Sequence, residues 1–145
     1  MLKGIPPILS PELLAVLRSM GHGDELVLAD GNFPAASIAT RLIRADGHSI
    51  PELLDAILEL LPVDDYIDSP AAVMGVVPGD PVVPVIWDKY RELLNHHEGR
   101  EVPISELERF AFYDRARKAY AVVATGESAQ YANLILSKGV VRPKN

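Results

Sequence analysis

The residues best suited to chemistry are a histidine and an aspartate at the two ends of one segment, MGHGDELVLADGNFP, at residues 20–34. His22 lies between two glycines, and Asp30 follows a short apolar-leaning run. Histidine both donates and accepts protons near neutral pH, because its ordinary pKa is about 6.5. If His22 follows a helix and Asp30 ends a strand, loop geometry could bring both to one crevice. The alternative is that His22 merely ends a helix and Asp30 is an ordinary turn residue.

A second group of polar side chains lies toward the end of the chain. Tyr131 and Asn133 are two residues apart, so in an extended segment both would face one side and could hold the hydroxyls of a polyol. Core packing for the tyrosine and a turn for the asparagine are the alternatives. Arg109 could offer fixed donors to an oxygen-rich ligand, or form a solvated ion pair with an acid such as Glu106.

The adjacent residues His96, His97 and Glu98 form a cluster of potential metal ligands. Neighbouring residues at a helix end point in different directions, and the usual spacing of paired histidine ligands is absent. We therefore expect no metal site.

Composition limits the class of protein. The 145 residues are 48% hydrophobic and 23% charged, which is typical of one globular domain covering residues 1–145. A net charge of −6 without a basic stripe argues against nucleic-acid binding. The apolar runs are too short for a membrane span, and the start of the chain lacks a signal-peptide pattern. A cytoplasmic location is the default expectation.

Helical and strand patterns alternate along the chain. Ser10-Pro11-Glu12 opens a helix that Gly21 would end in the left-handed conformation. Further helices are predicted at about 50–61 and 86–94, and from a capping-box spacing at Ser105 to about 119. Strands are predicted at 25–29, 71–77, 120–124 and 131–136. The alternation predicts an α/β fold, a three-layer sandwich whose central sheet is mostly parallel or mixed, with helices on both faces.

Several stretches together carry a family resemblance: SPELL (10–14), GHGDE (21–25), ADGNFP (29–34), RADG (44–47), RFAFYDRARKAYAVVATGE (109–127) and YANLILSKGV (131–140). In this order and spacing, the sequence resembles the L-fucose mutarotase and D-ribose pyranase family over nearly its whole length. The long stretch from Arg109 and the Phe33-Pro34 pair are closer to the fucose branch. Gly31 departs from the alanine of many relatives and Asn32 from the histidine of some, and both bear on the rim of the expected pocket.

The resemblance implies roles for particular residues. His22 would be the proton donor, and the sugar would be contacted by Asp30, Arg109, Tyr131, Ala132 and Asn133. It also implies a homo-oligomer, commonly a ring-shaped decamer of two stacked pentamers with sites near subunit boundaries.

The implied activity is the exchange of sugar anomers, most readily of L-fucose, by opening and closing the cyclic hemiacetal. The reaction has no redox step, so we expect no cofactor. His22 would protonate the ring oxygen, while Tyr131 would stack on the sugar or donate its hydroxyl. Tyr120 is a further candidate, although its strand position favours packing. The alternatives are D-ribose pyranase activity and a non-catalytic monosaccharide-binding accessory protein.

Overall fold

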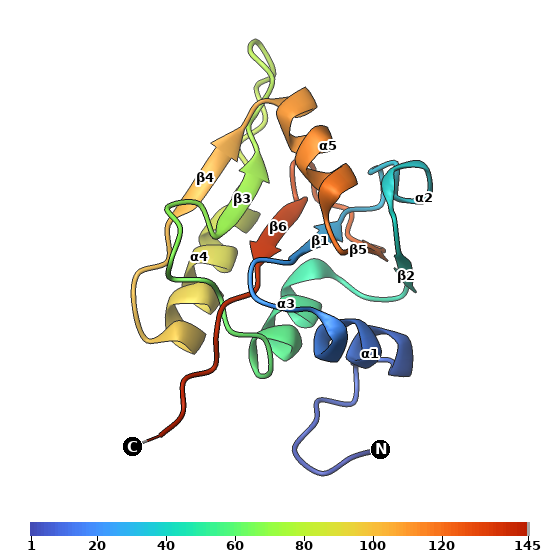
Figure 1. Ribbon diagram of the computed structural model, residues 1–145. Coiled ribbons are helices and arrows are strands. Elements are labelled where there is room, and N and C mark those ends of the chain that lie inside the picture. Colours follow the sequence, from blue (N-terminus) through green and yellow to red (C-terminus); the bar gives the residue numbers. More distant parts are fainter. Residues whose placement is uncertain (145) are drawn as a thin grey trace.

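The computed structural model describes residues 1–144 and is built around a six-stranded mixed sheet (Figure 1). The strand order is β2-β5-β1-β6-β3-β4. The elements follow the chain as α1 (Pro11–Ser19), β1 (Glu25–Ala29), α2 (Ala35–Ile38), β2 (Leu42–Ala45), α3 (Ile50–Leu58), β3 (Ala71–Met74), α4 (Ile86–Glu98), β4 (Ile104–Leu107), α5 (Arg109–Lys118), β5 (Ala121–Thr125) and β6 (Leu134–Ser137).

The strand directions decide where the functional side chains lie. β1 is parallel to β5, β5 to β2, and β3 to β4, whereas β6 runs antiparallel to both β1 and β3. Five strands therefore point the same way, and their carboxyl ends meet the amino end of β6 at one edge of the sheet. Ligand sites in open α/β sheets form at such an edge.

Helices cover both faces of the sheet, which confirms the predicted three-layer α/β architecture. Side chains alternate along a strand, so β1 sends Leu26 and Leu28 into one core and Val27 and Ala29 into the other. The first core is completed by α1, α3 and α4, and the second by α2 and α5. Figure 1 shows α5 across one face and α3 and α4 on the other. None of the helices in the described part of the chain has the length and apolar character needed to cross a lipid bilayer.

Most predicted elements are confirmed with shifted ends, but the ending of the first helix was predicted wrongly. Ser10 caps α1 as expected, with its hydroxyl accepting from the Leu13 amide at 3.1 Å. The cap at the other end is Met20, in an extended conformation. Positive φ falls on Gly23 at 87° and not on Gly21, because the turn runs from Gly21 to Asp24, closed by a hydrogen bond from the Asp24 amide to the Gly21 carbonyl, and Gly23 is its third residue.

The capping box predicted at Ser105 is also wrong. Residues Ile104–Leu107 form β4, which pairs with β3, and α5 begins only at Arg109. The Glu108 carboxylate caps this helix by accepting from the amides of Phe110 and Ala111. Ser105 and Glu108 have the spacing of a capping box, but Ser105 lies within a strand. There the backbone amides and carbonyls form their hydrogen bonds with the neighbouring strand, so no helix cap is needed.

Candidate functional site

A pocket of about 200 Å³ opens at the edge where the carboxyl ends of the parallel strands meet the start of β6. Three predicted site residues, Asp30, Tyr131 and Asn133, line it together. The other lining residues come from the loop after β1, the end of β3 and the loop that follows it, α5 and the segment before β6: Asn32, Phe33, Met74, Asp80, Tyr113 and Gln130.

Asp30 is a buried carboxylate that lines this pocket, with only 6% of its surface exposed. It directly follows β1, and its Oδ1 accepts from the amide of Asn32 at 3.0 Å. Burial raises the pKa of the Asp30 carboxyl above its ordinary value, although backbone amides, that of Asn32 first among them, oppose the shift. The group is suited to binding a hydroxyl because it is shielded from water and held by the backbone.

Asn133 is held against the end of β1 by a hydrogen bond from the Asp30 amide to its Oδ1 at 2.8 Å. The same segment is fixed through its carbonyls, since the Tyr90 hydroxyl donates to the Ala132 carbonyl at 2.6 Å. Ala132 is fully buried. The amide nitrogen of Asn133 is left free of this contact and can serve a ligand in the pocket.

Tyr131 does not lie on a strand, so the prediction of an extended segment from residue 131 is wrong. β6 begins at Leu134, and Tyr131 has φ of 57°, the one positive value among non-glycine residues in the described chain. The indole Nε1 of Trp87 donates to the Tyr131 carbonyl at 2.8 Å, which holds this unusual turn. Residues in such conformations concentrate at functional sites.

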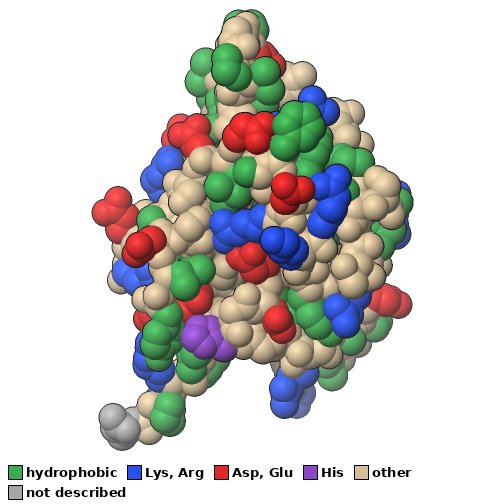
Figure 2. Space-filling view, turned by 45° about the horizontal axis from the view of Figure 1, so that its top comes forward, with side chains coloured by type: hydrophobic (Ala, Val, Ile, Leu, Met, Phe, Trp, Pro, Cys, Tyr) green, Lys and Arg blue, Asp and Glu red, His purple; other side chains and the backbone are tan. Residues whose placement is uncertain are grey.

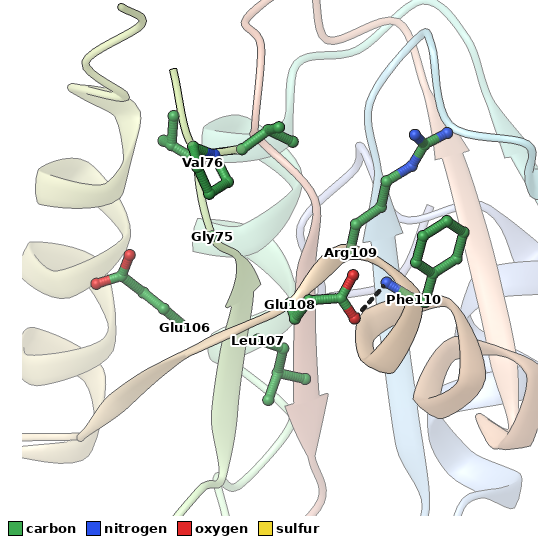
Figure 3. Close-up of a pocket in the computed structure, with 9 residues that line it drawn as sticks. Gly75, Val76, Glu106, Leu107, Glu108, Arg109 and Phe110 are labelled. Atoms are coloured by element: carbon green, nitrogen blue, oxygen red, sulfur yellow. Dashed lines mark hydrogen bonds between the residues drawn. The ribbon is translucent and has the colours of Figure 1, made fainter. Parts of the chain in front are cut away.

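Arg109 lies beside the pocket and not in its wall. It lines an adjoining, mainly apolar cavity of about 420 Å³ between residues 75–78 and 106–110 (Figure 3). Its Nε donates to the Tyr113 hydroxyl at 3.3 Å, and its guanidinium is 5.4 Å from the ring centroids of Phe110 and Tyr113. The alternative ion pair with Glu106 does not form. Tyr113 lines the pocket and also accepts the hydrogen bond from Arg109. Arg109 is therefore linked to the pocket through Tyr113.

His22 lies at the opposite edge of the sheet, so the expectation of one crevice shared with Asp30 within the chain is wrong. It precedes β1, whereas Asp30 follows it, and five strand residues at about 3.3 Å each separate the two by roughly 16 Å. The side chain is 45% exposed, and its Nε2 is 3.0 Å from Oδ1 of the buried Asp64. The rings of His22 and Tyr66 are 5.0 Å apart.

The remaining candidates also lie away from the pocket. Tyr120 precedes β5 at the same edge as His22, with the Arg41 guanidinium 4.0 Å above its ring. Near the end of α4, His97 contacts Asp55 at 2.7 Å while Glu98 accepts from the Val63 amide. Residues 1–144 contain no cluster of three side chains arranged to hold a metal ion.

Comparison with known proteins places the chain in a family. The sequence model of the RbsD / FucU transport protein family matches residues 3–141. A fucose mutarotase from Danio rerio is 59% identical, over 99% of this chain and 96% of its own length. The chain belongs to the RbsD / FucU family.

Solved structures of this family agree with the architecture. The crystal structure of the fucose mutarotase in complex with L-fucose from Streptococcus pneumoniae is 55% identical, with a TM-score of 0.93 over 97% of this chain and all of that one. Bacillus subtilis RbsD complexed with D-ribose is more distant, at 23% identity and a TM-score of 0.71 over 98% of this chain and all of that one, and shares the fold. The fucose branch is the nearer one, as the sequence predicts.

Sequence reasoning missed Asp80 and Tyr113 in this RbsD / FucU family member. Asp80 lies in the turn Pro78-Gly79-Asp80-Pro81, which the sequence marks only as a break after a strand. Tyr113 occupies a position on α5 that looks like an ordinary core residue. Its placement follows from the packing of α5 against the loop after β1, where the rings of Tyr113 and Phe33 are 5.6 Å apart, and the periodicity of a single sequence does not encode such a contact.

Burial of Asp30 predicts a pH-dependent gain in stability for Asp30→Asn. A raised folded-state pKa means that the native protein binds the proton more tightly, so the wild type loses stability as pH rises from about 4 through the folded pKa. The asparagine variant has no such loss. We expect it to be more stable than the wild type at neutral pH, with the difference shrinking toward pH 3, measured by urea unfolding across pH. A difference that does not vary with pH would contradict the prediction.

Proposed function

We propose that this protein is an L-fucose mutarotase, a cofactor-independent isomerase that exchanges sugar anomers by opening and closing the ring. The observation that carries the proposal is full-length similarity to a fucose mutarotase solved with L-fucose. The pocket around Asp30 supports it, because carboxylate, carboxamide and phenol groups are suited to binding the hydroxyls of a monosaccharide.

Each polar group has a task in this reaction. Asp30 and the Asn133 amide hold sugar hydroxyls, so that the open-chain aldehyde recloses without leaving the pocket. Arg109 orients the Tyr113 phenol at the rim. His22 donates a proton to the ring oxygen as the bond from the anomeric carbon breaks.

The position of His22 requires a second chain in this proposal. An imidazole at the far edge of the sheet cannot reach a sugar beside Asp30 in the same chain, so a neighbouring copy supplies it. We therefore propose a homo-oligomer with shared sites, in line with the ring-shaped decamer that the family resemblance implies. A cytoplasmic location belongs to the same proposal.

Saturation-transfer NMR on a panel of aldoses tests the activity. We expect the protein to accelerate exchange between the α and β anomers of L-fucose more strongly than exchange in D-ribose. Faster exchange for ribose would favour the pyranase alternative. Line broadening of fucose with exchange at the uncatalysed rate would indicate a binding protein without turnover and would refute the mutarotase assignment.

A further inference from the structure

The Tyr131 hydroxyl forms a hydrogen bond with the carboxylate of Asp80. It donates to Oδ2 of Asp80 at 2.6 Å, because an ionised carboxylate can only accept. The Val77 amide donates to the same phenol oxygen at 3.3 Å. The other carboxylate oxygen of Asp80, Oδ1, accepts from the Val82 amide at 3.1 Å, which fixes the aspartate within its turn.

The loop that carries Asp80 is thereby anchored to the pocket. It extends beyond the sheet after β3 (Figure 1), and hydrophobic side chains gather at this end of the molecule (Figure 2). Tyr131 is held from the other side by the hydrogen bond from Trp87 to its carbonyl. Both ends of the tyrosine are therefore fixed, and the direction of its O–H bond is set by Asp80.

This arrangement decides what the phenol can offer a sugar. A phenol oxygen has one proton and two acceptor positions. The proton goes to Asp80, and Val77 takes one acceptor position, so the one position left to a sugar hydroxyl in the pocket is an acceptor. Of the two roles expected for Tyr131, stacking on the sugar and donating its hydroxyl, this hydrogen bond opposes the second.

We propose that Asp80 is a positioning residue that makes the Tyr131 phenol the acceptor of the anomeric hydroxyl proton. The inference rests on the proposed mutarotase function and identifies the group that works opposite His22. Asp80 acts through the tyrosine, and the tyrosine oxygen is the atom that meets the sugar.

The proton movements balance in both directions. As the anomeric O–H proton moves to the Tyr131 oxygen, the phenol proton moves to Asp80 Oδ2, and the anomeric oxygen forms the aldehyde C=O bond. The electron pair of the bond between the anomeric carbon and the ring oxygen goes to the ring oxygen, which takes a proton from His22. Ring closure on the other face of the aldehyde reverses every transfer, so no further reactant is consumed.

The electrostatics of the pair agree with this role. The hydrogen bond with Asp80 raises the pKa of the Tyr131 phenol, and the same bond lowers the pKa of the Asp80 carboxyl. At rest the pair is therefore a neutral phenol on an ionised carboxylate. The nearby positive charge of Arg109 has the opposite effect and lowers the pKa of the Tyr131 phenol.

Asp80→Asn tests the proposal with little change of shape. The amide oxygen can still accept from Val82, but the amide group donates to Tyr131 and turns the phenol proton toward the pocket. We expect kcat for fucose anomer exchange to fall by about a hundredfold, the lower end of what general acid–base catalysis contributes, with KM nearly unchanged. Tyr131→Phe should be impaired to a similar extent, and the double variant should be no worse than the more impaired single variant, because the two groups act as one unit.

Asp88→Asn is the matched control, because Asp88 is an exposed residue on α4 whose ion pair is with Arg91, a surface residue of the same helix. It should keep wild-type kcat. A wild-type kcat in Asp80→Asn, an effect on KM alone, or losses that multiply in the double variant would overturn the role of Asp80. A wild-type protein that fails to accelerate exchange at all would instead refute the proposed function.

Discussion

Replacing His22 with glutamine is expected to leave a folded oligomer in which the acceleration of L-fucose anomer exchange is lost. Glutamine keeps a polar side chain of similar size at the loop before β1 but cannot donate a proton to a leaving oxygen. General acid catalysis is typically worth about a hundredfold to ten-thousandfold, so the exchange rate should fall by that factor. Saturation-transfer NMR at fixed enzyme concentration measures it, and circular dichroism and sedimentation check the fold and assembly.

His96→Gln is the matched control for this experiment. His96 is exposed near the end of α4, so the same change of residue type there should leave the exchange rate unaltered. If His22→Gln retains the wild-type rate, the assignment of His22 as proton donor is wrong.

Subunit mixing tests where the proton comes from. Chains carrying His22→Gln have an intact pocket, and chains carrying Asp30→Asn have an intact histidine. If each site combines His22 of one chain with Asp30 of another, reassembly of an equal mixture should restore about a quarter of the sites. Recovery would support a shared site. Mixed oligomers as inactive as their parents would contradict it.

The strands that could be predicted from the sequence are those buried on both faces. β1, β3 and β5 are apolar except for Glu25 at the start of β1 and Thr125 at the end of β5, and each is fully or nearly fully buried. β2 and β4 were missed. They are four-residue edge strands with mixed exposure, and such short segments resemble loops or helix starts until their partner strands are known.

The candidate site divides in a similar way. Asp30 was predictable because a polar residue that directly ends a buried strand falls at the ligand-binding edge. Asp80 and Tyr113 were not, because their approach to the pocket depends on contacts between distant segments, such as the bond from Tyr131 to Asp80. The misplacement of His22 has another cause. A residue before a strand and a residue after it must lie at opposite edges of the sheet, so the wrong expectation came from ignoring strand direction.

The loop after β5 has no room for a side chain at Gly126, and the second large expected effect follows from this. An added Cβ would overlap the carbonyl oxygen of Asp46, which is a backbone atom and cannot rotate away. The Gly126 amide also donates to the His48 carbonyl at 3.0 Å, so the two loops are joined at the same point. Gly126→Ala must separate them, and overpacking of this kind costs about 1–3 kcal/mol or more.

The displacement should reach the pocket, because the loop also supports the end of β1. The Glu127 carbonyl accepts from the Gly31 amide at 2.8 Å, directly beside Asp30. We therefore expect Gly126→Ala to lose both stability and sugar binding, with Tm lower by roughly 3–10 °C if the cost is about 1–3 kcal/mol. Gly47→Ala is the matched control from the facing loop, where an added Cβ meets no atom within 4 Å, and it should be neutral or slightly stabilising. Equal Tm values for the two variants, by differential scanning calorimetry, would show that the loops separate at little cost and that Gly126 does not hold the end of β1 in place.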